Sequence, residues 1–305
     1  MMKIVFMGTP DFAVPVLKAL NEKYEIVLVV SQPNRAKKKG VFLDTPVAAC
    51  AKELGLNLFQ PEKIKDDYEC IINSGADVLV SAAYGQYVPS KILNAFKYTL
   101  NVHGSILPKH RGGAPIQRCL INGDEYTGIS IIEMAKKLDA GKVYATQEYK
   151  ILPEDNNSSL FRKLAIIGSA LLMDTIEDVY SGKNIGVAQN DLEATYSPNI
   201  RPEEEKIDLN KTSKEIVNQI RGLSYEPGAY LLVGDIKLKV FAAKEVECDL
   251  NEAPGTVLDT KKKIVLKTND SAIELLEVLY PGKKLMSGKD FSNGQKIFIV
   301  KDVLK

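Results

Sequence analysis

The sequence is short of the residue types that carry much of enzyme chemistry. Among 305 residues it has two histidines, His103 and His110, so any imidazole chemistry must come from one of these two. Its four cysteines are scattered along the chain, without a CxxC pair or a Cys/His cluster. This pattern argues against a structural zinc site and a disulfide framework, and it fits a reducing compartment.

An excess of charge and long apolar runs are also missing. The 40 Lys and Arg residues balance 39 Asp and Glu residues, so bulk charge indicates no general affinity for nucleic acid or membranes. Apolar stretches such as residues 165–173 are far too short to span a membrane, and the N-terminus lacks a signal-peptide pattern. We therefore expect a cytoplasmic protein with no membrane partner.

The first half of the chain alternates between two hydrophobic periods. Apolar, β-branched runs that predict strands cover residues 3–7, 25–30, 77–82 and 99–102. Segments with helical spacing lie between them, at residues 12–22, 46–54, 67–74 and 91–96. Strands at 127–134 and 142–151 and a long helix at 158–180 follow. This order predicts an α/β fold with a Rossmann-like, doubly wound, mostly parallel sheet that binds ligands beyond the strand C-termini.

The last third of the chain follows a different pattern. Residues 189–206 are polar and contain two prolines and three consecutive glutamates, which is typical of an extended linker. A short helix at 214–223 precedes five alternating segments with tight turns between them, at 229–233, 236–243, 255–258, 263–268 and 272–279. We predict a first domain at 1–188, a linker at 189–206, and a smaller antiparallel, OB-like β-barrel at 207–305.

The loop after the first strand, Gly8-Thr9-Pro10-Asp11-Phe12, occupies the place of a dinucleotide-binding fingerprint but holds a single glycine. Pro10 and Phe12 stand where the backbone would have to approach a pyrophosphate closely, which argues against NAD or FAD. Two interpretations remain. The loop is a helix start capped by Thr9 or Asp11, or it presents Phe12 to an apolar group of a substrate.

The stretch from Asn101 to Pro108 carries the strongest chemical signal. Asn101 and His103 are two residues apart on a predicted strand, so both side chains leave the same face. An amide that stabilises an oxyanion, beside an imidazole that moves a proton, is what acyl transfer needs. A histidine at a strand end is more often structural than catalytic, but the Asn-x-His spacing and the turn ending in Pro108 favour the catalytic interpretation.

Asp139 is the predicted partner of His103. It lies in the loop between the two later strands, where an aspartate is often only a turn residue. As a partner it would orient or charge the imidazole. The sequence has no G-x-S-x-G elbow and no cysteine beside His103, so we expect direct transfer between two bound substrates.

Positive charge gathers locally despite the overall balance. Arg35, Lys37, Lys38 and Lys39 follow the second strand, at the same predicted edge as Asn101. Such a run is usually only a solvated surface. Its place beside the candidate site also favours a polyanionic substrate.

In these motifs the sequence resembles the methionyl-tRNA formyltransferases, which are folate-dependent formyltransferases. The resemblance covers nearly the whole chain and includes residues 6–13 (FMGTPDFA), 83–86 (AYGQ), 101–108 (NVHGSILP), 111–117 (RGGAPIQ) and 138–141 (LDAG). The Asn-x-His…Asp set alone is shared with glycinamide ribonucleotide and amino-sugar formyltransferases. The GTPDFA opening and the C-terminal barrel favour the tRNA enzymes. Two departures are Ile106, where leucine is usual, and the absence of tryptophan.

The resemblance implies a one-carbon transferase that moves the formyl group of 10-formyltetrahydrofolate to the α-amine of methionine on initiator tRNA, for translation initiation. Asn101 would donate to the formyl oxygen, and His103, held or charged by Asp139, would assist proton transfer to the departing folate nitrogen. The implied folate-binding residues are Tyr84, Gly85, Gln86, Ser105, Ile106, Leu107 and Pro108. The implied methionyl-tRNA-binding residues are Phe12, Arg35, Lys37, Lys38 and Lys39. The resemblance also implies a monomer without a metal, whose C-terminal barrel binds the tRNA.

Two alternatives stay open. A nucleotide-sugar N-formyltransferase would have the same catalytic set, and it would need a nucleotide pocket but not the basic loop. A non-catalytic or dinucleotide-binding Rossmann protein with an attached barrel is the other, and the single glycine of the first loop argues against it.

Overall fold

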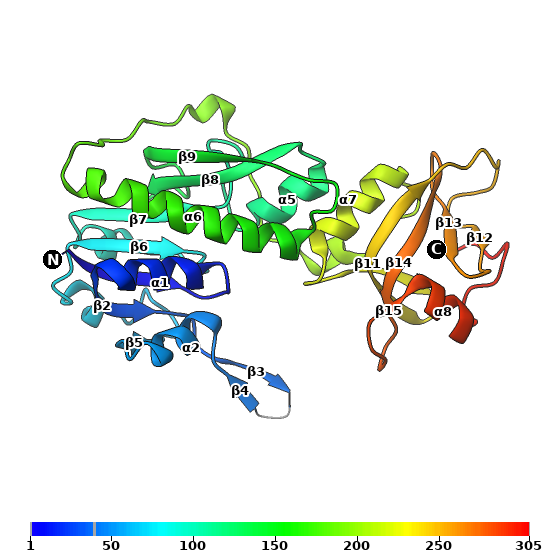
Figure 1. Cartoon of the computed structure of the whole chain (residues 1–305), viewed down its shortest axis with the longest axis horizontal. Helices are drawn as coiled ribbons and strands as arrows, with labels where there is room; N and C mark the ends of the chain where they lie inside the picture. Colours follow the sequence, from blue (N-terminus) through cyan, green and yellow to red (C-terminus); the bar gives the residue numbers. More distant parts are fainter. Residues whose placement is uncertain (1, 39–40, 305) are drawn as a thin grey trace. The chain divides into compact units, whose positions relative to one another are not determined.

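The computed structural model describes residues 2–38 and 41–304, and for residues 35–38, 41 and 42 it describes the backbone only. The chain forms two compact units (Figure 1). The N-terminal unit extends to Pro115 and adds Tyr126–Lys150 and Phe161–Pro198. The C-terminal unit contains Ile116–Glu125, Ile151–Leu160 and the residues from Asn199 onward. These two early segments could not be assigned to the C-terminal part from the hydrophobic pattern alone.

A seven-stranded sheet forms the centre of the N-terminal unit, in the order β5-β2-β1-β6-β7-β8-β9. Its strands are β1 (Lys3–Gly8), β2 (Glu25–Val30), β5 (Leu58–Phe59), β6 (Val78–Ala82), β7 (Tyr98–His103), β8 (Tyr126–Glu133) and β9 (Val143–Lys150). The strands from β5 to β7 run parallel, whereas β8 and β9 pair antiparallel. The predicted Rossmann-like, mostly parallel sheet is confirmed.

Helices cover both faces of this sheet: α1 (Ala13–Lys23), α2 (Pro46–Glu53), α3 (Glu69–Ile72), α4 (Ser90–Leu93) and α6 (Asn157–Tyr180). Figure 1 shows α1 and α6 along the same face, and a hydrogen bond of 3.1 Å from Ser169 Oγ to the Pro15 carbonyl joins them. Val5 and Met7 pack on the opposite face in a core shared with α3 and α4. Both strand faces are therefore buried, which explains the continuous apolar run of β1.

Several elements differ from the sequence-based expectation. The basic loop contains a hairpin of β3 (Arg35–Lys38) and β4 (Val41–Leu43), and α5 (Pro115–Asn122) forms where no helix was predicted. The helices predicted at 67–74 and 91–96 shrink to the four residues each of α3 and α4. Two 3-10 turns, η1 (Asp191–Glu193) and η2 (Pro202–Glu205), lie in the predicted linker.

The capping interpretation of the first loop is wrong. Helix α1 begins after Phe12 without a side-chain cap. Thr9 Oγ1 instead donates a 2.7 Å hydrogen bond to the carbonyl of Tyr84. The hydroxyl is used to fasten a second loop, the one that follows β6, rather than to start the helix.

An antiparallel sheet forms the C-terminal unit, in the order β10-β11-β14-β13-β12, with β15 paired to β14. The elements are α7 (Ser213–Leu223), β10 (Ala229–Val233), β11 (Ile236–Val246), β12 (Val257–Asp259), β13 (Ile264–Lys267), β14 (Ala272–Leu279), β15 (Met286–Ser287) and α8 (Gly288–Gly294). Within the described residues β10 and β12 end the path unpaired with each other, so the predicted barrel is a half-barrel.

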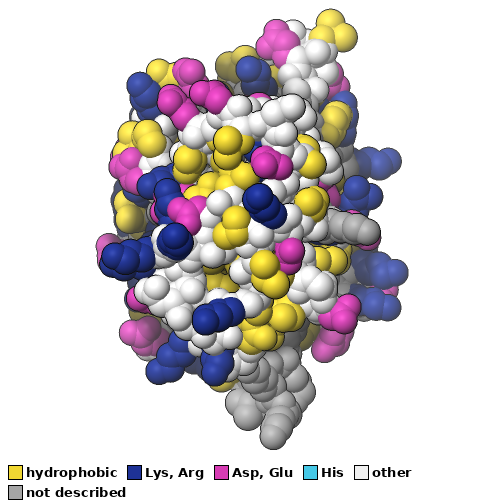
Figure 2. All heavy atoms as spheres, turned by 90° about the vertical axis from the view of Figure 1, so that its right-hand side faces the viewer, with side chains coloured by type: hydrophobic (Ala, Val, Ile, Leu, Met, Phe, Trp, Pro, Cys, Tyr) yellow, Lys and Arg dark blue, Asp and Glu magenta, His cyan; other side chains and the backbone are white. Residues whose placement is uncertain are grey.

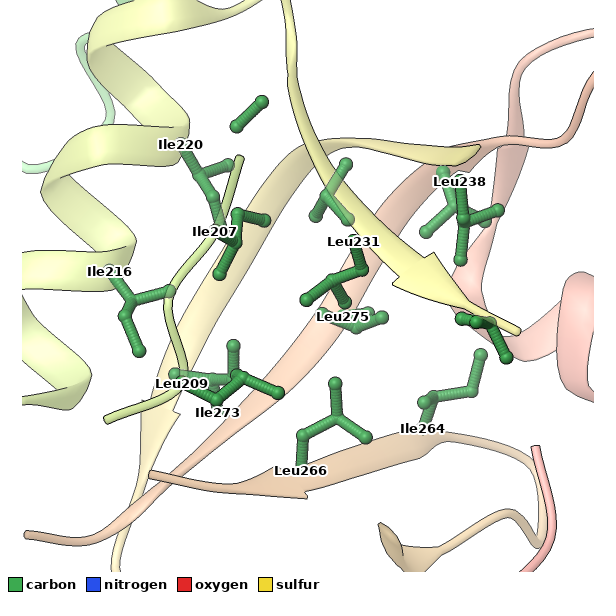
Figure 3. Close-up of a cluster of buried hydrophobic side chains, with 14 of the residues drawn as sticks. Ile207, Leu209, Ile216, Ile220, Leu231, Leu238, Ile264, Leu266, Ile273 and Leu275 are labelled. Atoms are coloured by element: carbon green, nitrogen blue, oxygen red, sulfur yellow. The ribbon is translucent and has the colours of Figure 1, made fainter. Parts of the chain in front are cut away.

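The core of this unit lies between the half-barrel and α7. Ile216 and Ile220 of α7 belong to one buried cluster with Leu231 and Leu275 of the sheet, as Figure 3 shows. A reciprocal capping box starts α7, because Thr212 Oγ1 accepts from Glu215 N and the Glu215 carboxylate accepts from Thr212 N. Across the described part of the chain, none of the helices combines the length and apolarity that crossing a membrane requires.

Candidate functional site

Strand β7 carries Asn101 and His103 at the carboxyl edge of the sheet. Asn101 pairs with Ser81 of β6 and with Ile132 of β8, and His103 pairs with Ser130. The two side chains share one face of the strand, because successive residues alternate. The His103 side chain is only 5% exposed, whereas Asn101 is half-buried.

The Asn101 carboxamide makes no hydrogen bond to any residue that the structure describes. A half-buried amide at a strand end would ordinarily be satisfied by a neighbouring polar group or by water. Its two N–H donors are therefore available to an acceptor that approaches the edge of the sheet.

The imidazole of His103 lies between a carbonyl and a carboxylate. Nε2 is 3.0 Å from the carbonyl oxygen of His110, and Nδ1 is 3.8 Å from Oδ2 of Asp139. A carbonyl oxygen only accepts, so Nε2 carries the proton of that hydrogen bond. Nδ1 is then the nitrogen that gains or loses a proton, and a proton there faces the Asp139 carboxylate.

Asp139 comes from the loop between β8 and β9, and its backbone is in the left-handed region with φ of 50°. Its Oδ2 accepts a 2.9 Å hydrogen bond from the backbone N–H of Gly112. The side chain is 11% exposed. The structure thus brings together His103 and Asp139, two of the three predicted catalytic residues, and places Asn101 one side-chain repeat earlier on the same strand.

The turn after β7 contains Ser105, Ile106, Leu107 and Pro108, and it is fixed to the sheet by one serine of β8. Ser130 Oγ donates to the Ser105 carbonyl at 2.7 Å and accepts from Leu107 N at 3.1 Å. The Ile106 side chain lies over Gly128, where a Cβ would come within 2.5 Å of the Ile106 Cδ1 atom. The backbone of the turn is therefore tied to β8 on both sides of Ile106.

The loop after β6 contains Tyr84, Gly85 and Gln86, and its polar side chains point into the protein. The Gln86 Oε1 atom accepts from Ile64 N at 3.0 Å. The Tyr84 ring is buried in the core, its hydroxyl has no partner among the described residues, and burial raises the pKa of this phenol. The Tyr84 carbonyl accepts from both Thr9 Oγ1 and Gln32 Nε2. Because these side chains point inward, the loop can contact a ligand mainly through its backbone N–H and carbonyl groups.

The structure describes only some of the residues that were predicted to contact the tRNA and the methionyl group. Phe12 is 3% exposed, and its ring packs on Phe161 at a centroid distance of 5.2 Å. Lys39 and the side chains of Arg35, Lys37 and Lys38 lie outside the described residues, although the backbone of the latter three forms β3. On the face shown in Figure 2, basic side chains are scattered among acidic and apolar ones.

Sequence reasoning missed several residues that surround His103 and Asp139. His110 and Gly112 contribute a backbone carbonyl and a backbone N–H, which leave no mark in a side-chain pattern. Arg111 is fully buried, and Gln189 bonds to it with its amide oxygen. Among the described residues, no group of three His, Cys, Asp or Glu side chains could hold a metal ion.

Two protein-family models match the chain. One, described as formyl transferase, covers residues 2–176, and the other, formyl transferase C-terminal domain, covers residues 199–296. Curated relatives named methionyl-tRNA formyltransferase, from Streptococcus pneumoniae strains Hungary19A-6 and 70585, are 44% identical to this chain. The alignment extends over 300 residues, 96% of this chain and 96% of each relative.

Solved structures share the fold. WlaRD, a sugar 3N-formyl transferase solved in the presence of dTDP and 5-N-formyl-THF, matches with a TM-score of 0.70 and 18% identity, over 93% of this chain and 99% of its own. A methionyl-tRNA formyltransferase from Clostridium thermocellum matches with a TM-score of 0.56 and 18% identity, over 81% and 94%.

HypX from Aquifex aeolicus, in complex with tetrahydrofolic acid, matches with a TM-score of 0.64 and 16% identity. The alignment covers 97% of this chain but 47% of HypX, so this chain spans about half the length of that protein. At such identities the likeness to these three structures concerns the fold.

Proposed function

This chain belongs to the methionyl-tRNA formyltransferases within the formyl transferase family, and from that premise we propose that it moves the formyl group of 10-formyltetrahydrofolate onto methionyl initiator tRNA. The α-amine of the methionine attacks the formyl carbon, and the bond from that carbon to the folate nitrogen breaks. The product is a formylated amine for translation initiation, a reaction of the cytoplasm. We assign this work to a monomer whose residues 1–188 are catalytic and whose residues 207–305 bind the tRNA, with 189–206 between them.

The observation that carries the proposal is the unpartnered amide of Asn101 beside the imidazole of His103 on one strand face. In our proposal, Asn101 donates to the formyl oxygen, which gains negative charge when the amine attacks. A donor fixed in place at a developing oxyanion lowers the barrier, because the site needs no rearrangement as the charge forms.

His103 moves the proton in this scheme. The amine must lose a proton as its bond to the formyl carbon forms, and the departing folate nitrogen must gain one. Nδ1 of His103 is suited to both tasks, because the His110 carbonyl keeps the Nε2 proton in place. Asp139 faces Nδ1 at 3.8 Å and stabilises positive charge on the ring by Coulomb attraction.

The folate is bound by the two loops that leave the same sheet edge. The backbone around Tyr84, Gly85 and Gln86 and the turn of Ser105, Ile106, Leu107 and Pro108 supply the carbonyl and N–H groups. Both loops fit this role because side-chain hydrogen bonds from Thr9, Gln32 and Ser130 hold their backbones in place. No metal takes part in the proposed reaction.

The methionyl-tRNA is recognised by two parts of the N-terminal unit. Phe12 packs near the methionyl side chain, and the basic run of Arg35, Lys37, Lys38 and Lys39 reaches the phosphates of the acceptor stem. The Phe12 ring is buried against Phe161, so in this proposal it supports the residues that contact the methionyl side chain from beneath them.

A single assay tests the proposed function. The full chain is incubated with 10-formyltetrahydrofolate and, in parallel, with methionyl initiator tRNA or with an amino-sugar nucleotide. We expect the mass of one CO to be added to the methionine amine and none to the sugar. Formylation of the sugar nucleotide alone would replace our proposal with the nucleotide-sugar alternative. Tight binding of NADH without formyl transfer would instead support a dinucleotide-binding protein.

A further inference from the structure

We propose that residues 189–197, hereafter the strap, position the catalytic pair, and that Gln189 and Thr195 are positioning residues for Asp139 and His103 respectively. The strap follows α6 in the N-terminal unit and lies within the stretch expected to be a linker. The inference rests on the proposed function for the reaction that the pair performs. The contacts that support it belong to the protein alone.

Gln189 fixes the backbone of the Asp139 loop. Its Nε2 donates to the carbonyl of Asp139 at 2.9 Å and to the carbonyl of Gly141 at 2.7 Å. Its Oε1 accepts from Nε and Nη2 of Arg111, at 3.1 and 2.8 Å. The amide cannot be turned around, because arginine has no acceptor and carbonyls have no donor. One side chain therefore ties the Asp139 loop to Arg111 in a single orientation.

Asp139 needs such a restraint. Its φ of 50° is in the left-handed region, which is unfavourable for a residue with a Cβ. A second tie comes from Lys137 of the same loop, which pairs with the carboxylate of Asp191 in the strap. Without the strap, the loop would be free to relax, and the Asp139 carboxylate would move away from Nδ1 of His103.

The other end of the strap fixes His110, whose carbonyl holds Nε2 of His103. Thr195 Oγ1 accepts from the backbone N–H of His110 at 2.8 Å, and Ser197 Oγ lies 2.7 Å from Nδ1 of the His110 ring. His110 is also left-handed, with φ of 61°. The strap thus positions both groups beside the His103 ring, the His110 carbonyl at Nε2 and the Asp139 carboxylate at Nδ1.

Arg111 joins the two ends. Its side chain is fully buried, and Nη1 pairs with Oδ1 of Asp191 at 2.7 Å. Its backbone exchanges hydrogen bonds with the strap, from Arg111 N to the Thr195 carbonyl and from Ser197 N to the Arg111 carbonyl. A buried guanidinium whose donors are used in this way is not available to a substrate, so Arg111 acts through its neighbours.

The test uses three variants of the full chain. Gln189→Ala removes the tie to the Asp139 loop, and Thr195→Val removes the hydroxyl that holds His110. Gln147→Ala is the matched control, because this exposed glutamine on β9 bonds only to the carbonyl of Glu148. We expect Gln189→Ala to lower kcat by roughly 10- to 100-fold, since small displacements at a catalytic group have effects of this size. The control should keep the kcat of the wild type.

The first readout measures coupling. Gln189→Ala is combined with Asp139→Asn, and kcat and its pH profile are compared with those of each single variant. If Gln189 acts through Asp139, the second substitution adds little, and the pH profile of Gln189→Ala moves toward that of Asp139→Asn. If the two decreases in kcat multiply in the double variant and the pH profile of Gln189→Ala keeps the wild-type shape, Gln189 supports only the fold and our inference is wrong.

The second readout needs no activity. With two histidines in the chain, a ¹⁵N spectrum of the imidazole nitrogens contains four signals, and a His103→Gln variant assigns them. We expect Gln189→Ala to change the Nδ1 signal of His103, Thr195→Val to change its Nε2 signal, and the control to change neither. Unchanged His103 signals in both variants would overturn the inference even if the wild type formylates methionyl-tRNA. Changed signals in a protein without that activity would refute the proposed function and retain the strap.

Discussion

His103 Nδ1 lies 3.8 Å from Oδ2 of Asp139, and this same oxygen accepts a hydrogen bond from Gly112 N. The separation is too long for a hydrogen bond but short enough for Coulomb attraction between a protonated ring and the carboxylate, whose side chains are 5% and 11% exposed. The Asp139 carboxylate is thus anchored to backbone, and Nδ1 of the His103 ring makes no hydrogen bond to it. This contact joins the end of strand β7 to the loop between β8 and β9.

Replacing Asn101 by alanine is predicted to lower kcat by about 10²–10³-fold, the usual effect of removing one oxyanion donor. The thermal midpoint of unfolding should stay near that of the wild type, because this amide has no partner among the described residues. Steady-state kinetics and circular dichroism measure the two quantities. Asn73→Ala, at an exposed asparagine that follows α3, is the control. A kcat of wild-type size in Asn101→Ala would rule out the assigned role.

Gly85→Ala is predicted to weaken folate binding. Gly85 has φ of 89°, and a Cβ there would lie 2.1 Å from Nε2 of Gln32, which donates to the Tyr84 carbonyl. Losing that hydrogen bond and shifting the loop should raise KM for the folate roughly tenfold, the equivalent of about 1.4 kcal/mol. Gly75→Ala separates this effect from backbone strain, because Gly75 has φ of 68° and open space around its Cβ position. Equal KM values in both variants would contradict the folate-binding role of this loop.

The basic run is predicted to contribute phosphate contacts. Substituting Lys37, Lys38 and Lys39 together by alanine should raise KM for the tRNA while kcat changes little. With fewer phosphate contacts, tRNA binding releases fewer counterions. The dependence of tRNA binding on salt concentration should therefore become less steep. A triple variant at the exposed Lys18, Lys63 and Lys65 controls for net charge. If the variant and the control show the same salt dependence as the wild type, the run is only a solvated surface.

Glu204 is predicted to make the C-terminal unit sensitive to acid. The Arg118 guanidinium holds both carboxylate oxygens, at 2.6 and 3.0 Å, and lowers the pKa of Glu204 to about 2. Because the folded-state pKa is depressed, this contribution to stability is complete above the ordinary carboxyl value and is lost as the pH falls toward 2. Glu204→Gln should cost about 1.5–3 kcal/mol at neutral pH.

Urea unfolding at about pH 7, 5 and 3, followed by circular dichroism, measures this difference. The difference in the free energy of unfolding between the wild type and Glu204→Gln should narrow from about pH 5 to about pH 3 without closing, because the folded carboxyl group stays largely ionised above its pKa of about 2. Glu203→Gln, at an exposed neighbour, should match the wild type throughout. A constant gap between Glu204→Gln and the wild type at every pH would show that the ion pair is not its cause.

The parallel sheet could be predicted because its strands are buried on both faces. In β1, Val5 and Met7 are buried on one face of the sheet, and Ile4 and Phe6 are buried on the other. Because both faces require apolar side chains, the strand appears in the sequence as a continuous apolar run. The spacing of Asn101 and His103 could be interpreted for the same reason, since a strand imposes a period of two. The short helix α5 was missed because its start follows a Gly- and Pro-containing stretch that is typical of a loop.

The strap could not be predicted from the sequence. Its contacts run from side chains to backbone groups far away in the chain, as from Gln189 to the carbonyls of Asp139 and Gly141. Such contacts impose no period on the sequence, and a polar stretch without a hydrophobic period looks the same whether it is tied down or extended. The burial of Arg111 was equally hidden, because a buried arginine depends on partners that only the folded chain brings together.

The hydrogen bond from Nε2 of His103 to the His110 carbonyl also limits the path of the proton. Because Nε2 donates its proton to this carbonyl, the ring cannot take up a proton at one nitrogen and release it from the other. Whatever proton His103 takes up at Nδ1 has to depart from Nδ1. In the proposed reaction, the attacking amine and the departing nitrogen would therefore both exchange a proton with Nδ1, so both substrates would have to bind on the same flank of the ring.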